Sequence, residues 1–181
     1  MEKVIDFAHN VIKSKVSQND YCVDMTVGNG NDTLFLCGLA KHVYGFDIQQ
    51  LAIDNTQKKL KENNFDNYSL YLDSHENLSK YVTNKVKAFI YNLGYLPKGD
   101  KTITTNYIST INSLKQALLL LDNNGVIVLV IYEGHEEGKI ESIKVNEFVS
   151  SLNQKEYDVI NYKFINQINN PPYVIVIERK N

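Results

Sequence analysis

Residues 126–131 of this chain are six apolar side chains in succession, VIVLVI, directly after the turn-forming sequence DNNG. An unbroken apolar run of this kind is typical of a strand that is buried on both faces. Both faces of a sheet are covered when helices connect parallel strands and pack on either side of them. The segment therefore predicts an α/β protein with a central strand between two helical layers.

Further strand-like runs alternate with amphipathic segments of helix length, which is the pattern of an α/β sheet. Helices are predicted at residues 3–15, 32–40, 51–63, 108–121 and 136–152. Strands are predicted at residues 21–25, 42–46, 68–72, 86–91, 126–131, 157–165 and 173–178. The polar, proline-containing segment 95–105 is predicted to be a loop. The short connection 166–172 indicates an antiparallel hairpin of the last two strands at the sheet edge.

This order resembles the class I methyltransferase sheet, a Rossmann-like fold. Such a sheet has seven mostly parallel strands with a C-terminal antiparallel hairpin, and helices on both faces. An NAD-type Rossmann domain would normally end with another parallel strand. A chain of 181 residues without a repeat or a linker suits one core, so we expect a single domain over residues 1–181.

The composition of the chain indicates the cell compartment in which we expect it. No apolar run approaches the roughly 20 residues that cross a membrane, and the first 15 residues mix charged and apolar side chains, unlike a signal peptide. Cys22 and Cys37 lie in apolar runs, so we expect two buried thiols in a reducing compartment. The cysteines are distant in sequence and the four histidines are scattered, so no metal site is expected. We therefore expect a cytoplasmic protein.

The charge balance limits the kind of nucleic acid that the chain can hold. The formal net charge is −2, and Arg179 is the only arginine. Proteins that grip long duplexes usually carry a large basic excess, because lysine and arginine neutralise the phosphates. Any nucleic-acid footprint is therefore expected to be small or locally basic.

The first predicted strand runs into the sequence DMTVGNGNDT, which combines a glycine turn with a helix start. Gly28 and Gly30 allow a tight turn and a close approach to a ligand, and Asp32 and Thr33 can cap the helix. Asp47 ends the second strand nineteen residues after Gly28. An acidic side chain at that distance accepts hydrogen bonds from ribose hydroxyls, so the loop is expected to bind a nucleoside-containing cofactor.

Three kinds of ligand loop can be compared with this sequence. A dinucleotide loop has three glycines as GxGxxG, but Thr33 stands at the third position, and the GK[ST] of a phosphate loop is missing. A methyltransferase loop has an acidic residue and then glycines at alternate positions. Asp24, Gly28 and Gly30 fit that pattern, although Thr26 stands where the first glycine is expected. The alternative is a tight turn without a ligand, against which the acidic residue after the second strand argues independently.

Polar residues also follow the third and fourth predicted strands, where loops line the ligand crevice of such sheets. Asp73 or Ser74 could meet an adenine amino group, and His75 is either a further contact or a surface histidine. Asn92 and Tyr95 have the Asn-x-x-aromatic spacing found in amine-methylating enzymes. In that pattern the Asn side chain accepts hydrogen bonds from the target amine, and the aromatic ring stacks on the base.

The sequence NPPY at residues 170–173 matches the same pattern, but it belongs to the final hairpin, so we reject it as the catalytic motif. It can still shape the mouth of the substrate site. After the fifth strand, Tyr132, His135 and the turn glycines are expected to border the substrate. Alternatively, Glu136 and Glu137 simply favour a helix N-terminus there. No dedicated base stands out, and Glu133 and His135 are the candidates.

The sequences DMTVGNGNDT, GFDIQ, LDSHENL, NLGYLPKGDK, YEGHEEG and NNPPYVIVIE cover nearly the whole chain in order. In these motifs the chain resembles one family, the tRNA 5-(aminomethyl)-2-thiouridine methyltransferases, formerly filed as rRNA methylases. The resemblance implies S-adenosylmethionine as the cofactor. It also implies methyl transfer to the aminomethyl nitrogen of 5-aminomethyl-2-thiouridine at the tRNA wobble position, giving 5-methylaminomethyl-2-thiouridine.

The motifs and the resemblance together assign residues to roles. The expected catalytic residues are Asn92 and Tyr95. The expected cofactor-binding residues are Thr26, Gly28, Asn29, Gly30, Asn31, Asp32, Thr33, Asp47, Ile48, Gln49, Asp73, Ser74, His75, Asn92, Leu93 and Gly94. The expected substrate-binding residues are Tyr95, Lys98, Lys101, Tyr132, His135 and Lys139. The expected partner is the anticodon stem-loop of tRNA, and the tyrosine-rich hairpin and apolar N-terminal helix leave room for a homodimer.

Other functions stay open at this point. A small-molecule N- or O-methyltransferase would transfer methyl groups without RNA. A non-catalytic module that binds S-adenosylmethionine or RNA would show no turnover. An NAD oxidoreductase is a more distant alternative that a cofactor titration would separate.

Overall fold

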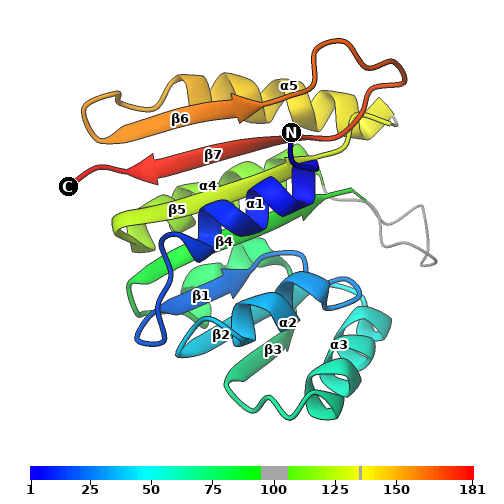
Figure 1. Ribbon diagram of the computed structural model, residues 1–181, viewed down its shortest axis with the longest axis vertical. Coiled ribbons are helices and arrows are strands. Elements are labelled where there is room, and N and C mark those ends of the chain that lie inside the picture. Colours follow the sequence, from blue (N-terminus) through cyan, green and yellow to red (C-terminus); the bar gives the residue numbers. More distant parts are fainter. Residues whose placement is uncertain (95–105, 135) are drawn as a thin grey trace.

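The computed structural model describes residues 1–94, 106–134 and 136–181, which form one sheet flanked by helices (Figure 1). The strands are β1 (Tyr21–Asp24), β2 (His42–Asp47), β3 (Tyr68–Leu72), β4 (Val86–Leu93), β5 (Leu121–Ile131), β6 (Tyr157–Tyr162) and β7 (Tyr173–Arg179). The helices are α1 (Val4–Lys13), α2 (Asn31–Cys37), α3 (Gln50–Glu62), the 3-10 helix η1 (His75–Lys80), α4 (Tyr107–Leu120) and α5 (Glu136–Ser150).

The sheet has the strand order β3-β2-β1-β4-β5-β7-β6. Neighbouring strands from β3 to β5 are parallel, whereas β7 is antiparallel to both β5 and β6. The carboxyl ends of the parallel strands therefore share one edge, on the right of Figure 1. The predicted mostly parallel sheet of seven strands with a C-terminal antiparallel hairpin is confirmed.

The two faces of the central strands carry different apolar side chains. In β5, Val126, Val128 and Val130 belong to the core under α1, α2 and α3, whereas Ile127, Leu129 and Ile131 belong to the core under α4 and α5. Figure 1 shows α1 and α2 in front of the sheet and α4 and α5 behind it. Each such side chain contributes about 1.5–3 kcal/mol by leaving water. This double burial explains the unbroken apolar run at residues 126–131.

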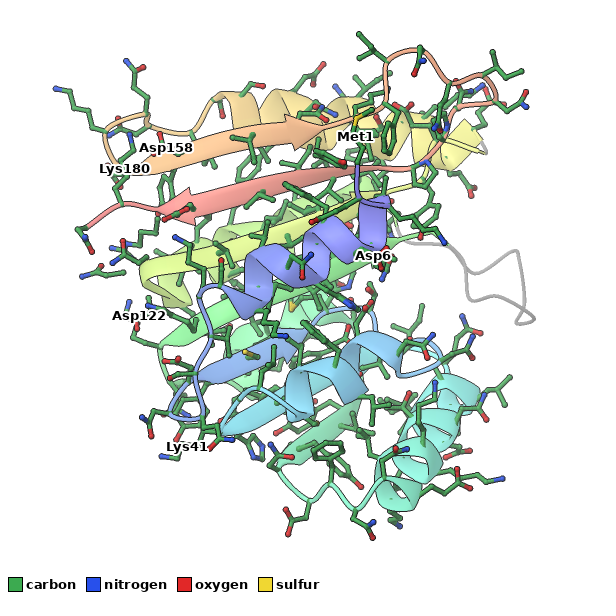
Figure 2. The ribbon with its side chains drawn as sticks, viewed as in Figure 1. Met1, Asp6, Lys41, Asp122, Asp158 and Lys180 are labelled. Atoms are coloured by element: carbon green, nitrogen blue, oxygen red, sulfur yellow. The ribbon has the colours of Figure 1, made fainter. Side chains whose placement is uncertain are left out.

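Helix α1 comes first in the sequence but packs against the last strands of the sheet. Its Phe7 ring stacks on Tyr162 of β6, with ring centroids 4.1 Å apart, and Lys15, just beyond the helix, pairs with Glu178 of β7. The last two strands are also joined by an ion pair: Lys180 Nζ, just after β7, lies 2.8 Å from Asp158 Oδ1 of β6, and both residues are labelled in Figure 2. Because of this packing, Ile5 near the start of α1 reaches the cavity described below.

Several element boundaries differ from the predicted ones. The residues 122–125 were expected to be a turn before the strand, but β5 begins at Leu121 and carries them as a bulge opposite Lys87. Lys87 Nζ donates to the Asn123 carbonyl oxygen, 2.7 Å away. The residues 122–125 thus do not pair with β4, but the strand continues after them. Strand β6 ends at Tyr162 rather than at residue 165.

Helix η1 was not predicted, because its six residues are too few to show a helical period. The Ser74 hydroxyl oxygen accepts from the Glu76 N–H, 3.3 Å away, and this cap starts the turn.

Both cysteines, Cys22 and Cys37, are buried free thiols in the core under α1 and α2, as expected. Within the described ranges, none of the helices has the length and apolar character needed to cross a membrane.

Candidate active site

A cavity of about 700 Å³ lies at the carboxyl ends of the parallel strands. Its lining comes from residues 25–29 after β1, 47–49 at the end of β2, 73–76 after β3, and Asn92 and Gly94 at and just after the end of β4. Such a crevice is where open α/β sheets bind ligands, and its size is in the range for small-molecule sites. Further lining residues are Ile5, Asn31, Asp32, Phe46, Asn106, Ser109 and Tyr132.

The glycine loop and Asp47 meet directly. Gly28 has φ +53°, and its N–H donates to Asp47 Oδ2 at 2.9 Å, while Asp47 Oδ1 accepts the Gln49 N–H at 2.9 Å. The carboxylate is thus held by two backbone donors. An ionised carboxylate offers about four acceptor sites, so it can still receive ribose hydroxyls.

Gly30, rather than a residue with a polar side chain, precedes the first residue of α2 as its N-cap. It has φ +72°, and a Cβ atom there would lie 2.5 Å from Thr56 Oγ1, so only glycine fits the turn. The expected capping by Asp32 and Thr33 is wrong, because the helix begins at Asn31 and no side chain caps it. The Thr33 hydroxyl instead donates to Asp24 Oδ2 at 2.6 Å.

Thr26, which replaces the expected first glycine, joins two loops. Its Oγ1 atom accepts the backbone N–H of Asn92 at 2.6 Å. A glycine could not make this contact, since it has no side chain. The departure from the methyltransferase pattern thus ties the loop after β1 to the end of β4.

Acidic side chains concentrate around this loop. Asp24 is buried, and burial, followed by the charge of Asp32, raises its pKa to about 7. Asp32 is also buried, and its carboxylate accepts hydrogen bonds from His9 Nε2 at 2.6 Å and from the Asn92 side-chain amide. Asp32 and Asp47, which both line the cavity, favour a positively charged ligand there.

The polar cluster after β3 has distinct parts. Asp73 accepts the Tyr81 hydroxyl at 2.8 Å, as well as the Ser74 N–H and the Asn77 amide, and these bonds lower the pKa of its carboxyl. His75 is buried and its Nδ1 donates to the Met25 carbonyl at 2.9 Å, so the alternative of a surface histidine is wrong.

Burial lowers the pKa of His75 and keeps the imidazole neutral near pH 7. Its Nε2 atom is buried and has no hydrogen-bond partner among the described residues. A neutral imidazole that donates through Nδ1 can only accept through Nε2.

Most of the expected cofactor residues come together on this lining. The exceptions are Gly30, Thr33 and Leu93, which do not line the cavity. Gly30 forms the turn before α2, the Thr33 hydroxyl bonds Asp24, and Leu93 packs in the core. Of the expected substrate residues, Tyr132 is on the lining and 40% exposed, and Lys139 is exposed on α5. Tyr95, Lys98, Lys101 and His135 lie outside the described residues.

Sequence reasoning did not single out Ile5, Asn106 and Ser109, which line the cavity, or His9, which contacts the lining residue Asp32. Ile5 and His9 come from α1, one helical turn apart, and His9 is one of several polar residues on that amphipathic helix, so its type alone was no signal. Asn106 caps α4, its side chain accepting the N–H groups of Ile108 and Ser109 at 3.1 Å each. That cap places Asn106 and Ser109 at the cavity.

Solved structures with the same strand arrangement define the class. A protein described as a putative rRNA-methylase from Clostridium thermocellum superposes with a TM-score of 0.97 at 44% identity, covering 99% of this chain and 98% of that one. A protein described as a putative methyltransferase from Streptococcus mutans, solved in complex with SAH, gives 0.94 at 38% identity over 99% of both chains. The fold is that of a class I methyltransferase.

Sequence comparison narrows the class to a family. The family model described as "Putative rRNA methylase" matches residues 43–178. A chloroplastic Arabidopsis thaliana protein named tRNA (mnm(5)s(2)U34)-methyltransferase is 31% identical over 194 aligned residues, covering 99% of this chain and 71% of the relative. The chain belongs to this rRNA methylase family, and the resemblance seen in the sequence motifs is confirmed.

Proposed function

We propose that the chain, as one domain, transfers a methyl group from S-adenosylmethionine to the aminomethyl nitrogen of 5-aminomethyl-2-thiouridine at the tRNA wobble position. The product is 5-methylaminomethyl-2-thiouridine. The observation that carries the proposal is the amide of Asn92, which lines the cavity beside the Gly28–Asp47 loop. The name of the Arabidopsis thaliana relative supports the substrate.

The residues of the cavity suit S-adenosylmethionine. Asp47 has acceptor sites left for ribose hydroxyls, and Gly28 lets the backbone come close to a ligand. The unpartnered Nε2 atom of His75 can accept from a ligand amino group. Asp32, on the cavity lining, supplies negative charge for a ligand with cationic sulfonium and ammonium groups. When bound, this cofactor supplies an electrophilic methyl group on sulfur.

The target nitrogen must be neutral to act as a nucleophile. An alkyl ammonium has a pKa of about 10 in water, and a partly dry site beside a cation lowers it. The amine lone pair then forms the N–CH₃ bond as the S–CH₃ bond breaks, and the methylated nitrogen loses a proton. Asn92 would accept an N–H of the amine and aim its lone pair, so that positioning supplies much of the rate.

The RNA contacts are expected around the same edge of the sheet. A wobble nucleotide is in a loop and can be splayed into a pocket at low unstacking cost. Tyr95 would stack on its base or wall it, so Tyr95→Ala should weaken RNA capture and Tyr95→Phe should largely preserve it. Tyr132 borders the cavity and would contact the same nucleotide.

The test is methyl transfer to bulk tRNA that lacks the final methyl group, followed by mass spectrometry of the nucleosides. We expect 5-aminomethyl-2-thiouridine to gain one methyl group, and Asn92→Ala to lower the single-turnover rate far more than cofactor affinity. If cofactor binds but no tRNA nucleoside gains mass, the proposed reaction is wrong. If Asn92→Ala keeps a near-normal rate, the reacting group lies elsewhere, and the segment around His135 is the next place to examine.

A further inference from the structure

Three side chains from distant parts of the sequence form a line of hydrogen bonds that ends at the cavity. His9 on α1 donates through Nε2 to Asp32 Oδ1 at 2.6 Å. Asn92 at the end of β4 donates through its side-chain Nδ2 to Asp32 Oδ2. Asp32 and Asn92 line the cavity, whereas His9 stands behind them.

The charge of Asp32 decides how the Asn92 amide is turned. An ionised carboxylate has acceptors only, so an amide that faces it must present its NH₂ group. A flipped amide would set the Asn92 oxygen against a carboxylate oxygen and lose the bond. The backbone of Asn92 is held independently, because its N–H donates to Thr26 Oγ1 at 2.6 Å. Within the side chain, Oδ1 is then the atom that can accept a hydrogen bond from a ligand.

We propose that Asp32 is a positioning residue that keeps the Asn92 amide oxygen turned toward the target nitrogen, and that His9 holds Asp32 in place for this task. The inference rests on the proposed amine methylation. The inference adds Asp32 and His9 to the proposed reaction as residues that need not contact the target nitrogen. It also explains why a nucleophile with an N–H group suits the site, since the locked amide offers an acceptor.

The orientation of His9 is itself fixed. Its ring stacks on Phe35 of α2 with centroids 3.9 Å apart and planes 6° from parallel, which aims Nε2 at Asp32. The side chain is 25% exposed and is not part of the cavity lining. A substitution at His9 therefore acts on Asn92 through Asp32. Because Asp32 itself lines the cavity and His9 does not, a His9 variant tests the positioning role without removing a lining residue.

Two substitutions separate the hydrogen bond from the packing. His9→Phe keeps a ring for Phe35 but has no donor, and His9→Gln loses the ring but keeps an N–H donor. We expect His9→Phe to lower the single-turnover methylation rate on the order of 10- to 100-fold, while the cofactor dissociation constant changes less than about threefold. His9→Gln should recover most of that loss.

A matched control is available in His42→Phe. His42 also contacts an aromatic ring, that of Tyr44, and bonds Ser69, but it is not part of the cavity lining. It should leave the rate unchanged. Asp32→Asn is the direct variant: an amide in place of the carboxylate can pair with Asn92 in either orientation, so the rate should fall as in His9→Phe. Equal loss in His9→Phe and His9→Gln, or no loss in either, would overturn the proposal.

A readout without turnover keeps this inference apart from the proposed reaction. The side-chain NH₂ signals of Asn92 in ¹⁵N NMR, assigned by their absence in Asn92→Ser, should be sharp and slow to exchange in the unaltered protein. They should broaden in His9→Phe and Asp32→Asn but not in His42→Phe. If these signals behave so while no tRNA is methylated, only the proposed reaction fails. If Asn92 exchanges freely in the unaltered protein, the positioning role is wrong whatever the substrate.

Discussion

The backbone N–H of Asn92, at the end of β4, donates to the Thr26 hydroxyl oxygen in the loop after β1, with 2.6 Å between the two atoms. This hydrogen bond therefore fixes the loop that would bind the cofactor relative to the residue that would bind the target amine.

Replacing Thr26 by Val exchanges the hydroxyl for a methyl group of similar size. The Asn92 N–H then loses its acceptor, so we expect a loss of about 1–3 kcal/mol in the free energy of unfolding, together with slower methyl transfer. Thr26→Ser keeps the oxygen and should stay close to the unaltered protein. Urea unfolding and single-turnover kinetics would measure both effects, and equal behaviour of the two variants would refute the link.

Asp47→Ala should weaken S-adenosylmethionine binding. It removes both the expected ribose acceptor and the partner of the Gly28 N–H, a loss on the order of 1–3 kcal/mol. Asp54→Ala on α3 is the matched control, since its carboxylate accepts from the exposed Gln50 and is not part of the cavity lining. Calorimetry with S-adenosylmethionine would show the difference, and unchanged affinity in Asp47→Ala would mean that the ribose lies elsewhere.

Gly30→Ala should destabilise the fold. The backbone has φ +72°, a region that costs an L-residue about 1–2 kcal/mol, and the new Cβ would lie 2.5 Å from Thr56 Oγ1. Gly134→Ala should change stability by less than about 0.5 kcal/mol, because nothing lies within 4 Å of the added Cβ. Thermal unfolding of the two variants provides the comparison. Similar melting temperatures would contradict the prediction that a side chain at position 30 strains the backbone.

His75 should make stability fall in mild acid. Burial lowers its pKa in the folded protein, so below about pH 6.5 the unfolded chain takes up the proton first. Protonation thus stabilises the unfolded chain, and the contribution of His75 is lost as the pH falls below that value. His75→Asn, which can still donate to the Met25 carbonyl, should lose less stability between pH 8 and pH 5. If the unaltered protein and His75→Asn lost the same stability over this pH range, the imidazole would not be held neutral in the folded protein.

Lys98, Lys101 and Lys139 are the lysines expected to contact tRNA phosphates. If they do, affinity for an anticodon stem-loop should fall with salt, and each substitution to Gln should flatten the slope of log K against log salt by about 1. Lys41→Gln serves as a control, because Lys41 precedes β2 and lies away from the carboxyl edge of the sheet (Figure 2). Affinity that does not depend on salt would exclude these contacts.

Local patterns predicted what depends on local geometry. The run at residues 126–131 had to be a strand buried on both faces. The spacing of Gly28 and Asp47 follows from one strand–helix–strand unit and predicted that both belong to one ligand loop, but not the hydrogen bond between them. The short connection 166–172 predicted that β6 and β7 pair, but not that β7 rather than β6 lies beside β5.

Contacts between distant elements could not be predicted in this way. His9 reaches Asp32 only because α1 packs across β5 and β7, and nothing in residues 1–15 states which strands they will meet. Thr33 has the chemistry of a cap, yet the positive φ of Gly30 starts the helix earlier and Asp24 takes the hydroxyl. Side-chain type predicted a polar role for Thr33 but not its partner.

The burial of both cysteines has a practical consequence for spectroscopy. Burial raises the pKa of the Cys37 thiol to about 12 and that of Cys22 further still, so neither presents the thiolate that labelling reagents attack. The chain also contains no tryptophan. A single cysteine or tryptophan introduced at Ile168, which is 83% exposed in the connection between β6 and β7, would be the sole reactive thiol or indole fluorophore of the protein. Distance and intensity changes on adding tRNA could then be assigned to one known position without first removing any native residue.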